Sequence, residues 1–285
     1  VMLNTNLGMQ SDLLWGIIIG AAILVWVVIG PKNLEKVNIF AVGSLFILTI
    51  FLGATVFNRG SNANISGEMG FGAAIELSAA MPISWLPLIS DYTKDAKHPI
   101  TATRVSVITY FAGSVFMYTI GLGSAIFTGE SDIAVIMYKA GFGILGVLII
   151  LFSTVTTTYL DVYSAGVSLK TIHAGLPEKT MAIAVGLIGT AIAIFTPVEQ
   201  YQNFLYLIGS VFAPMISILI ADYFILKKDN IKKSVDVTNF IIWLIGFTIY
   251  RLLLNMNLAI GSTIPVMIIT VIICVIADKI RKLKV

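Results

Sequence analysis

The residues best suited to bind a small polar solute lie in two long apolar stretches of the chain. One of them, residues 152–168, reads FSTVTTTYLDVYSAGVS and gathers five hydroxyl groups within about one and a half helical turns. Ser153, Thr156 and Thr157 have the i, i+3, i+4 spacing that puts side chains on one helix face. Hard cations accept oxygen ligands of this kind, so the face is a candidate Na⁺ site. The alternative is that each hydroxyl bonds back to a carbonyl of its own helix.

An acidic residue follows the hydroxyl cluster. Asp161 lies four residues after Thr157 and therefore shares its helix face. Ionisable residues inside membrane spans are rare and mark substrate or ion pathways by default. The Asp161 carboxylate can accept N–H groups from an aminopyrimidine edge, or it can take part in cation or proton coupling. A structural ion pair is the alternative, but no Lys or Arg occupies the interior of a predicted span.

The second stretch carries two prolines inside an apolar run. Residues 70–91 read GFGAAIELSAAMPISWLPLISD, with Pro82 and Pro87 five residues apart. Proline removes an amide donor and clashes with the preceding helical turn, so the pair predicts an interrupted helix. Interrupted helices offer loose backbone groups to substrates in secondary transporters. A simple kink packed against neighbouring helices is the alternative.

Three side chains of this second stretch add to the candidate site. Ser84 and Trp85 lie between the prolines, and the Trp85 indole offers a flat stacking face for a planar ring. The alternative place for Trp85 is the interfacial aromatic belt. Glu76 lies in the same run, where an acidic side chain costs about 2.5–3.5 kcal/mol on insertion scales. It is a candidate proton-coupling group, or it lies near the outer mouth of the span.

The composition of the chain decides what surrounds these stretches. Of 285 residues, 58% are hydrophobic and 12% are charged, against roughly 45–50% and about 25% in soluble domains. A soluble globule of this size must wet much of its surface, so a bilayer has to supply the apolar surroundings. Cys274 is the single cysteine and forms no disulfide within the chain. His98 and His173 lack metal-ligand spacing, which argues against a membrane enzyme.

Nine apolar runs are long enough to cross a hydrocarbon core as helices of about 20 residues. Strands of a β-barrel would be about half as long and would alternate in polarity. Gly16 and Gly20 in the first run have the four-residue spacing that predicts close packing against another helix. The predicted spans are 13–30, 37–57, 70–90, 103–127, 141–167, 179–196, 203–226, 237–254 and 259–279.

Basic residues alternate between the two sides of these spans. Fifteen of the 18 fall on one side, whereas Arg59, Lys139 and Arg251 fall on the other. By the positive-inside rule the C-terminus is cytoplasmic and Val1 is extracellular, as expected for a multi-pass protein of the cell (plasma) membrane. A chain that starts outside without an export signal also predicts that an odd number of helices precedes Val1 in the full-length protein.

Three motifs resemble the nucleobase:cation symporter-1 family, which contains cytosine, purine and allantoin permeases and hydantoin transporters. Residues 89–94 (ISDYTK) resemble the end of that family's sixth helix. The hydroxyl cluster followed by residues 164–166 (SAG) resembles its eighth helix. Pro214 and residues 221–224 (ADYF) resemble its tenth helix. Residues 80–91 are most similar to the branch of hydroxymethylpyrimidine transporters, which is linked to thiamine precursor uptake.

The resemblance implies an all-α polytopic membrane protein with a LeuT-like inverted-repeat transporter fold. Of the twelve helices of that fold nine are expected here, so residues 1–285 would form one transmembrane transporter domain that lacks about three N-terminal helices. The resemblance also implies two sets of site residues. The substrate contacts are Met81, Pro82, Ser84 and Trp85 with Thr158 or Asp161, and the cation ligands are Ser153, Thr156 and Thr157.

The function that the resemblance implies is secondary active transport. The protein would import a pyrimidine-type nucleobase, hydroxymethylpyrimidine or cytosine, by alternating access coupled to Na⁺ or H⁺. Transport needs no covalent chemistry and no cofactor beyond the coupling ion, so we do not expect an enzyme. The expected partners are the heterocycle and the lipid bilayer, and not nucleic acid. The alternatives are a symporter of the same fold for an amino acid, a purine or allantoin, a membrane enzyme, and a structural membrane subunit.

Overall fold

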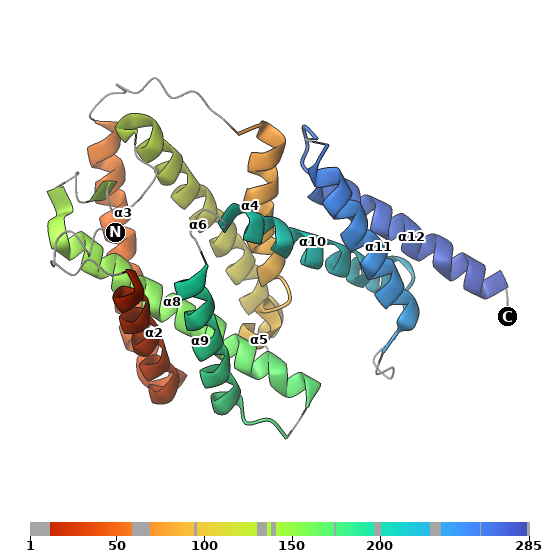
Figure 1. The fold of residues 1–285 in the computed structure, drawn as a ribbon, viewed down its shortest axis with the longest axis horizontal. Coiled ribbons are helices and arrows are strands. Elements are labelled where there is room, and N and C mark those ends of the chain that lie inside the picture. Colours follow the sequence, from red (N-terminus) through yellow and green to blue (C-terminus); the bar gives the residue numbers. More distant parts are fainter. Residues whose placement is uncertain are drawn as a thin grey trace. The chain divides into compact units, whose positions relative to one another are not determined.

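Helices make up the regular structure of the protein. The computed structural model describes residues 12–58, 69–93, 96–129, 136–137, 141–173, 175–196, 201–228, 235–256 and 258–283. Within these ranges it contains helices and no strand (Figure 1). The helices are α2 (Asp12–Ile29), α3 (Pro31–Phe57), α4 (Phe71–Trp85), α5 (Ile89–Thr93), α6 (Pro99–Thr128), α8 (Gly143–Ile172), α9 (Glu178–Phe195), α10 (Tyr201–Ile220), η3 (Ala221–Ile225), α11 (Val237–Leu254) and α12 (Thr263–Leu283).

Seven helices of the described part of the chain are long and apolar enough to cross a membrane. They are α3, α6, α8, α9, α10 with η3, α11 and α12. Two other predicted runs form shorter helices, namely Leu13–Ile29 within α2 and the 15-residue α4. Each of the nine apolar runs therefore coincides with a helix, and the protein is an α-helical multi-pass membrane protein. The sidedness of the two chain ends stays a prediction, because both ends lie outside the described residues.

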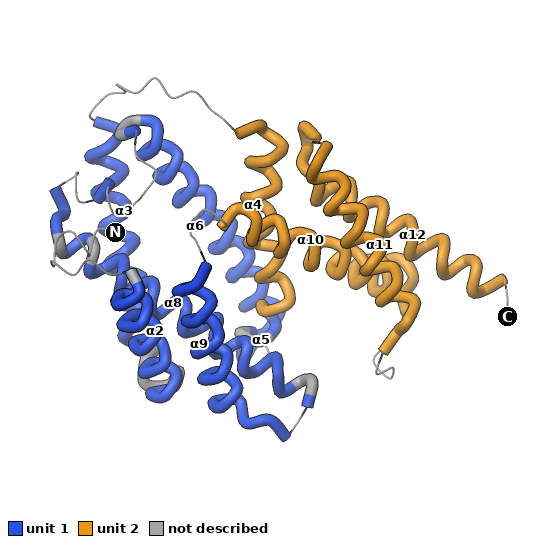
Figure 2. Tube along the Cα trace, in the orientation of Figure 1, with its two compact units in different colours: residues 1–66, 90–197 blue, residues 67–89, 198–285 orange. Residues whose placement is uncertain are grey.

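The helices form two compact units (Figure 2). Unit 1 comprises residues Val1–Ser66 and Ser90–Pro197, and unit 2 comprises Gly67–Ile89 and Val198–Val285. Helices α2, α3, α6, α8 and α9 belong to unit 1, and α4, α10, η3, α11 and α12 belong to unit 2. A single transmembrane domain over residues 1–285 stays a prediction. The chain passes between the two units three times, and one of these passages falls within α5, between Ile89 and Ser90.

Helix α8 is central to unit 1, where it packs against α2, α3 and α9. Close packing in this unit also involves Gly16 and Gly20 of α2, which face α9. A Cβ at Gly16 would lie 2.9 Å from Cγ1 of Ile194, and a Cβ at Gly20 would overlap the side chain of Thr190. The close helix packing predicted from the four-residue glycine spacing is confirmed.

Helix α10 is central to unit 2, where it packs against α4, α11 and α12. Pro214 lies inside α10, and Gly246 of α11 packs on its ring, because a Cβ at Gly246 would lie only 2.7 Å from the Cβ of Pro214. Ala213, Tyr250 and Val266 form the buried apolar cluster at this crossing of three helices. Unit 2 is therefore closely packed around a helix that contains a proline.

The outward faces of the helices are apolar. On α6, for example, Ile108, Phe111 and Leu122 are 64–69% exposed. Exposing such side chains to water would forfeit about 1.5–3 kcal/mol of transfer free energy for each. Lipid or further apolar protein must therefore cover this surface, in agreement with a membrane location.

Candidate functional site

Helix α4 is interrupted before the chain reaches α5. The helix runs through Pro82, and a turn at Leu86–Leu88 then separates it from α5. The N–H of Leu88 donates to the carbonyl of Trp85 at 3.0 Å, an i to i+3 bond instead of an α-helical one. The interruption predicted from the two prolines is confirmed, and it falls at Pro87, whose ring nitrogen has no hydrogen to donate.

Four predicted substrate residues occupy the last turns of α4. Met81 is 41% exposed and Pro82 is also exposed, whereas Ser84 and Trp85 are half-buried. The Ser84 hydroxyl donates to the carbonyl of Met81 at 2.8 Å. This bond uses the proton of the hydroxyl and leaves its oxygen able to accept. The end of α4 therefore offers a hydrogen-bond acceptor and an aromatic ring next to the interruption.

The predicted hydroxyl face of α8 is divided by burial. Ser153 and Thr156 are only 4% and 1% exposed, whereas Thr157 is exposed and Thr158 is half-buried. The hydroxyls of Thr156 and Thr157 both donate to the carbonyl of Ser153 at 2.9 Å. Hydroxyl bonds to carbonyls of the same helix are the arrangement that was predicted as the alternative to a cation site. They leave the oxygen lone pairs free for a cation, so the two arrangements do not exclude one another.

Asp161 is exposed on α8, one helical turn after Thr157. It has no hydrogen bond or ion pair with another described residue. An exposed, unpaired carboxylate within a membrane span needs water, a solute or a coupling ion near it. Asp161 belongs to unit 1, whereas residues 81–85 belong to unit 2. The contacts of Asp161 are therefore defined within unit 1, and those of residues 81–85 within unit 2.

The SAG motif that follows the hydroxyl cluster has a packing role. Ser164 is buried, and a Cβ at Gly166 would lie 2.6 Å from the carbonyl oxygen of Glu178 and 3.0 Å from the Cβ of Ala182. Glycine is therefore needed for α8 to approach α9 this closely. The structure explains this part of the motif without a substrate.

The sequence identified Glu76 but not the groups that surround it. Its side chain is 2% exposed and accepts four hydrogen bonds inside unit 2. Oε2 accepts from the backbone N–H groups of Ser262 and Thr263 at 2.6 and 2.8 Å. Oε1 accepts from the hydroxyls of Thr263 and Tyr250. Ser262 and Thr263 are residue types that favour helix starts, but no pattern in the sequence links them to Glu76.

Glu76 also lines a cavity of about 260 Å³ whose lining residues all belong to unit 2. The cavity is large enough for several water molecules. No other residue of this lining was predicted as a site residue. The polar side chains of the lining besides Glu76 are Asn203, Tyr206, Arg251, Asn255 and Ser262.

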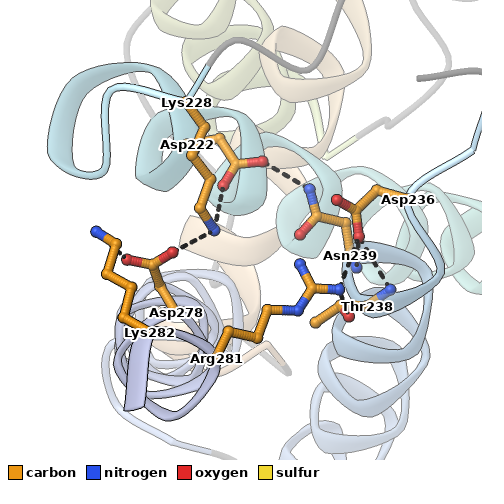
Figure 3. Close-up of polar contacts among 8 residues, drawn as sticks. All are labelled: Asp222, Lys228, Asp236, Thr238, Asn239, Asp278, Arg281 and Lys282. Carbon is orange, nitrogen blue, oxygen red and sulfur yellow. Dashed lines mark hydrogen bonds and ion pairs between the residues drawn. The ribbon is translucent and has the colours of Figure 1, made fainter. Parts of the chain in front are cut away.

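A second polar network lies at the start of α11 and the end of α12 (Figure 3). The Glu76 contacts lie at the other end of each of these helices. The Nζ of Lys228 lies 3.0 Å from Oδ1 of Asp278 and 3.7 Å from Oδ1 of Asp222. Lys282 pairs with Oδ2 of Asp278 at 2.9 Å. Nδ2 of Asn239 donates to Oδ2 of Asp222 at 2.6 Å. Salt bridges and a hydrogen bond thus tie the end of α10 to α11 and α12.

The π-helical segment η3 carries Asp222 into this network. It continues α10 and coincides with the ADYF motif at residues 221–224. Asp236 completes the network by capping α11, since its Oδ1 accepts from the N–H groups of Thr238 and Asn239 at 3.0 and 3.2 Å. The same oxygen lies 3.6 Å from Nη2 of Arg281 on α12 (Figure 3). The ADYF motif at residues 221–224 therefore has an observed structural role, since it links the end of α10 to α11 and α12.

Fold and polar residues together define a class of protein, a multi-pass helical membrane protein with an interrupted helix of the kind that secondary transporters use. The profile of the family described as "permease for cytosine/purines, uracil, thiamine, allantoin" matches residues 9–240. The chain belongs to this permease family, and it is a transporter rather than an enzyme. No curated protein matches the chain closely enough to count as a relative.

Proposed function

We propose that the protein is a symporter that imports a pyrimidine-type nucleobase, hydroxymethylpyrimidine or cytosine, with a Na⁺ or H⁺ gradient as the driving force. Membership of the cytosine/purine permease family supports a heterocyclic substrate. The observation that carries the proposal is the interruption of α4 directly after Ser84 and Trp85. Interruptions of this kind form substrate sites in secondary transporters.

The side chains proposed as substrate contacts suit an aminopyrimidine. Trp85 offers a stacking face for the ring, and Ser84 offers an acceptor oxygen beside it. The Asp161 carboxylate is proposed to accept N–H groups of the exocyclic amine, and the Thr158 hydroxyl to bond to a ring nitrogen or carbonyl. The full set of proposed substrate contacts is Met81, Pro82, Ser84, Trp85, Thr158 and Asp161.

The proposed coupling ion has two candidate routes in α8. Thr156 and Thr157 present hydroxyl oxygens that have donated their protons and keep their lone pairs, as a Na⁺ ligand must, and Ser153 adds a buried hydroxyl one turn earlier. Asp161 is the candidate for proton coupling, because it is exposed and has no described partner. Alternating access would then expose the occupied site to one side of the membrane at a time.

The Na⁺ route predicts the behaviour of a double variant. Ser153→Ala with Thr157→Ala removes two hydroxyl oxygens from the helix, so we expect the Na⁺ concentration for half-maximal uptake to rise by about tenfold, equivalent to 1.4 kcal/mol. Uptake of labelled pyrimidine at graded Na⁺ concentrations measures this shift. Thr55→Ala is the matched control, since its hydroxyl bonds back to its own helix in the same way but lies on α3.

Absence of Na⁺ dependence in the unaltered protein would exclude the sodium route. An unchanged Na⁺ requirement in the double variant would remove Ser153 and Thr157 from the cation site. A proton-coupled transporter would instead show uptake that follows pH and ignores Na⁺.

Competition for uptake tests the substrate class directly. Cells that produce the full-length protein should accumulate radiolabelled hydroxymethylpyrimidine or cytosine, and an excess of the unlabelled pyrimidine should abolish that signal. Adenine, allantoin and leucine serve as competitors for the other substrate classes. Accumulation of one of these three compounds that excess pyrimidine leaves unchanged would contradict the proposal.

A further inference from the structure

The buried Glu76 carboxylate makes the polar contacts that a helix end requires. The first N–H groups of any α-helix have no partner within that helix, and an acidic group near them is favourable because of the helix dipole. At the start of α12 the N–H groups of Ser262 and Thr263 point at Oε2 of Glu76. The cap of α12 is therefore supplied by α4, 186 residues earlier in the sequence than Ser262.

The same carboxylate also holds α11. The Tyr250 hydroxyl donates to Oε1 of Glu76, and Tyr250 is fully buried. The helices approach closely here because glycines face the polar groups. A Cβ at Gly261 would lie 2.8 Å from Oε2 of Glu76, and a Cβ at Gly209 of α10 would overlap the Tyr250 hydroxyl. One acidic group thus joins α4, α11 and α12, and a side chain in place of either glycine would clash with these polar groups.

The contacts of Glu76 suit a fixed anchor. Two of its four partners are backbone N–H groups, which can only donate, so Oε2 must stay an acceptor for these two bonds to form. The ionisable groups that the described part of unit 2 places near it are Tyr250 on α11 and, around the cavity, Tyr206 on α10 and Arg251 on α11. None of these groups is a second carboxylate that could share a proton with Glu76.

We infer that Glu76 is a positioning residue, which caps α12 and fixes the first part of α4 to α11 and α12 so that the end of α4 is held for substrate. This role rests on the proposed function, because Met81 and Ser84 follow Glu76 on the same helix. Removing the anchor should loosen the substrate contacts without changing how protons or Na⁺ drive transport.

Three single variants and one double variant of the full-length protein test the anchor in graded steps. Glu76→Gln removes the charge and replaces one of the two acceptor oxygens with a donor group, so the charge-assisted bonds are lost, and we expect the thermal unfolding midpoint in detergent to fall by about 5 °C or more. Tyr250→Phe and Thr263→Val each remove one hydroxyl and should lower the midpoint by less. Glu76→Gln combined with Tyr250→Phe should lower it by less than the sum of the two, because both changes act on one contact.

Ser78→Ala is the matched control on the same helix. The Ser78 hydroxyl is exposed, and among the described residues it bonds only to carbonyls of its own helix, those of Ala74 and Ile75. Its replacement should leave the midpoint unchanged. If Glu76→Gln, Tyr250→Phe and Thr263→Val all unfold at the temperature of Ser78→Ala, the anchor does not exist.

Uptake measurements distinguish a positioning role of Glu76 from a role in proton transfer. For a positioning residue, Glu76→Gln should raise the KM for the pyrimidine several-fold and keep the pH profile and Na⁺ dependence of the unaltered protein. A pH profile flattened by Glu76→Gln would overturn the inference in favour of a proton carrier. The unfolding midpoints need no substrate, so they test the anchor even if the transported compound is not a pyrimidine.

Discussion

Replacement of Asp161 with alanine is expected to reduce pyrimidine uptake by at least about 10–100-fold, the factor that corresponds to a charge-assisted hydrogen bond of about 1.5–3 kcal/mol. The variant should still insert into the membrane, because Asp161 is exposed and no described residue loses a partner. Exposed substitutions of this kind usually change the free energy of unfolding by no more than about 0.5 kcal/mol. Initial uptake rates, normalised to the amount of protein in the membrane fraction, measure the effect.

Two further variants define what the Asp161 carboxylate does. Asp161→Asn changes the acid to an amide, which keeps one acceptor oxygen and removes the charge. Glu178→Gln is the control, because it makes the same acid-to-amide change at an exposed ion pair with Lys170 and should leave uptake nearly unchanged. Uptake by Asp161→Asn above that of Asp161→Ala would indicate that the carboxylate accepts a hydrogen bond from substrate, and equal loss in both would indicate a need for charge. Normal uptake by Asp161→Ala would exclude this residue from the site.

Replacement of Gly72 with alanine is expected to be the most damaging single methyl addition in unit 2. Gly72 is the second residue of α4, and a Cβ there would overlap the backbone carbonyl of Leu258 in the loop before α12. A backbone group cannot move aside as a flexible side chain can. Overpacking of this kind typically costs about 1–3 kcal/mol and occasionally more, and we expect a cost at the upper end. Thermal unfolding midpoints and the monodisperse fraction in detergent measure it.

Gly70 provides the control two residues away. It precedes α4 with a φ of −66°, which any residue can adopt, and a Cβ there would meet no atom within 4 Å. Gly70→Ala should therefore change the unfolding midpoint little. If the two alanine variants were equally stable, the close contact between α4 and the loop before α12 would not exist in the native protein.

Apolarity alone was sufficient to place the helices. Every predicted run coincides with a helix because a span must be both long and apolar, and the sequence reports both properties directly. The ends were less predictable. The run expected to begin at residue 259 forms a helix only from Thr263, because Gly261 takes a φ of +73° and its N–H bonds back to Leu258. Residues 258–260 (LAI) before the turn are apolar, so apolarity alone extended the predicted run across Gly261 and Ser262, whose residue types favour a turn and a helix start.

The sequence was sufficient to select candidate site residues, but not to predict which residues they contact. The spacing of Ser153, Thr156 and Thr157 indicated one face of α8, yet burial places Thr157 apart from the other two. Periodicity gives the direction of a side chain and not the neighbour that covers it. The donors of Glu76 lie 174 to 187 residues further along the chain, and only the packing of four helices brings them to it.

Unit 2 is assembled from two separated pieces of the chain, which bears on its biosynthesis. Ser262 follows Glu76 by 186 residues, and ribosomes add roughly 5–20 residues per second. The Glu76 side chain is therefore synthesised roughly 10–40 s before the loop that supplies its donors. During that interval water, lipid head groups or a chaperone must solvate or bind the Glu76 carboxylate. Nascent or truncated chains that stop before Ser262 are thus the forms that membrane quality control should degrade first.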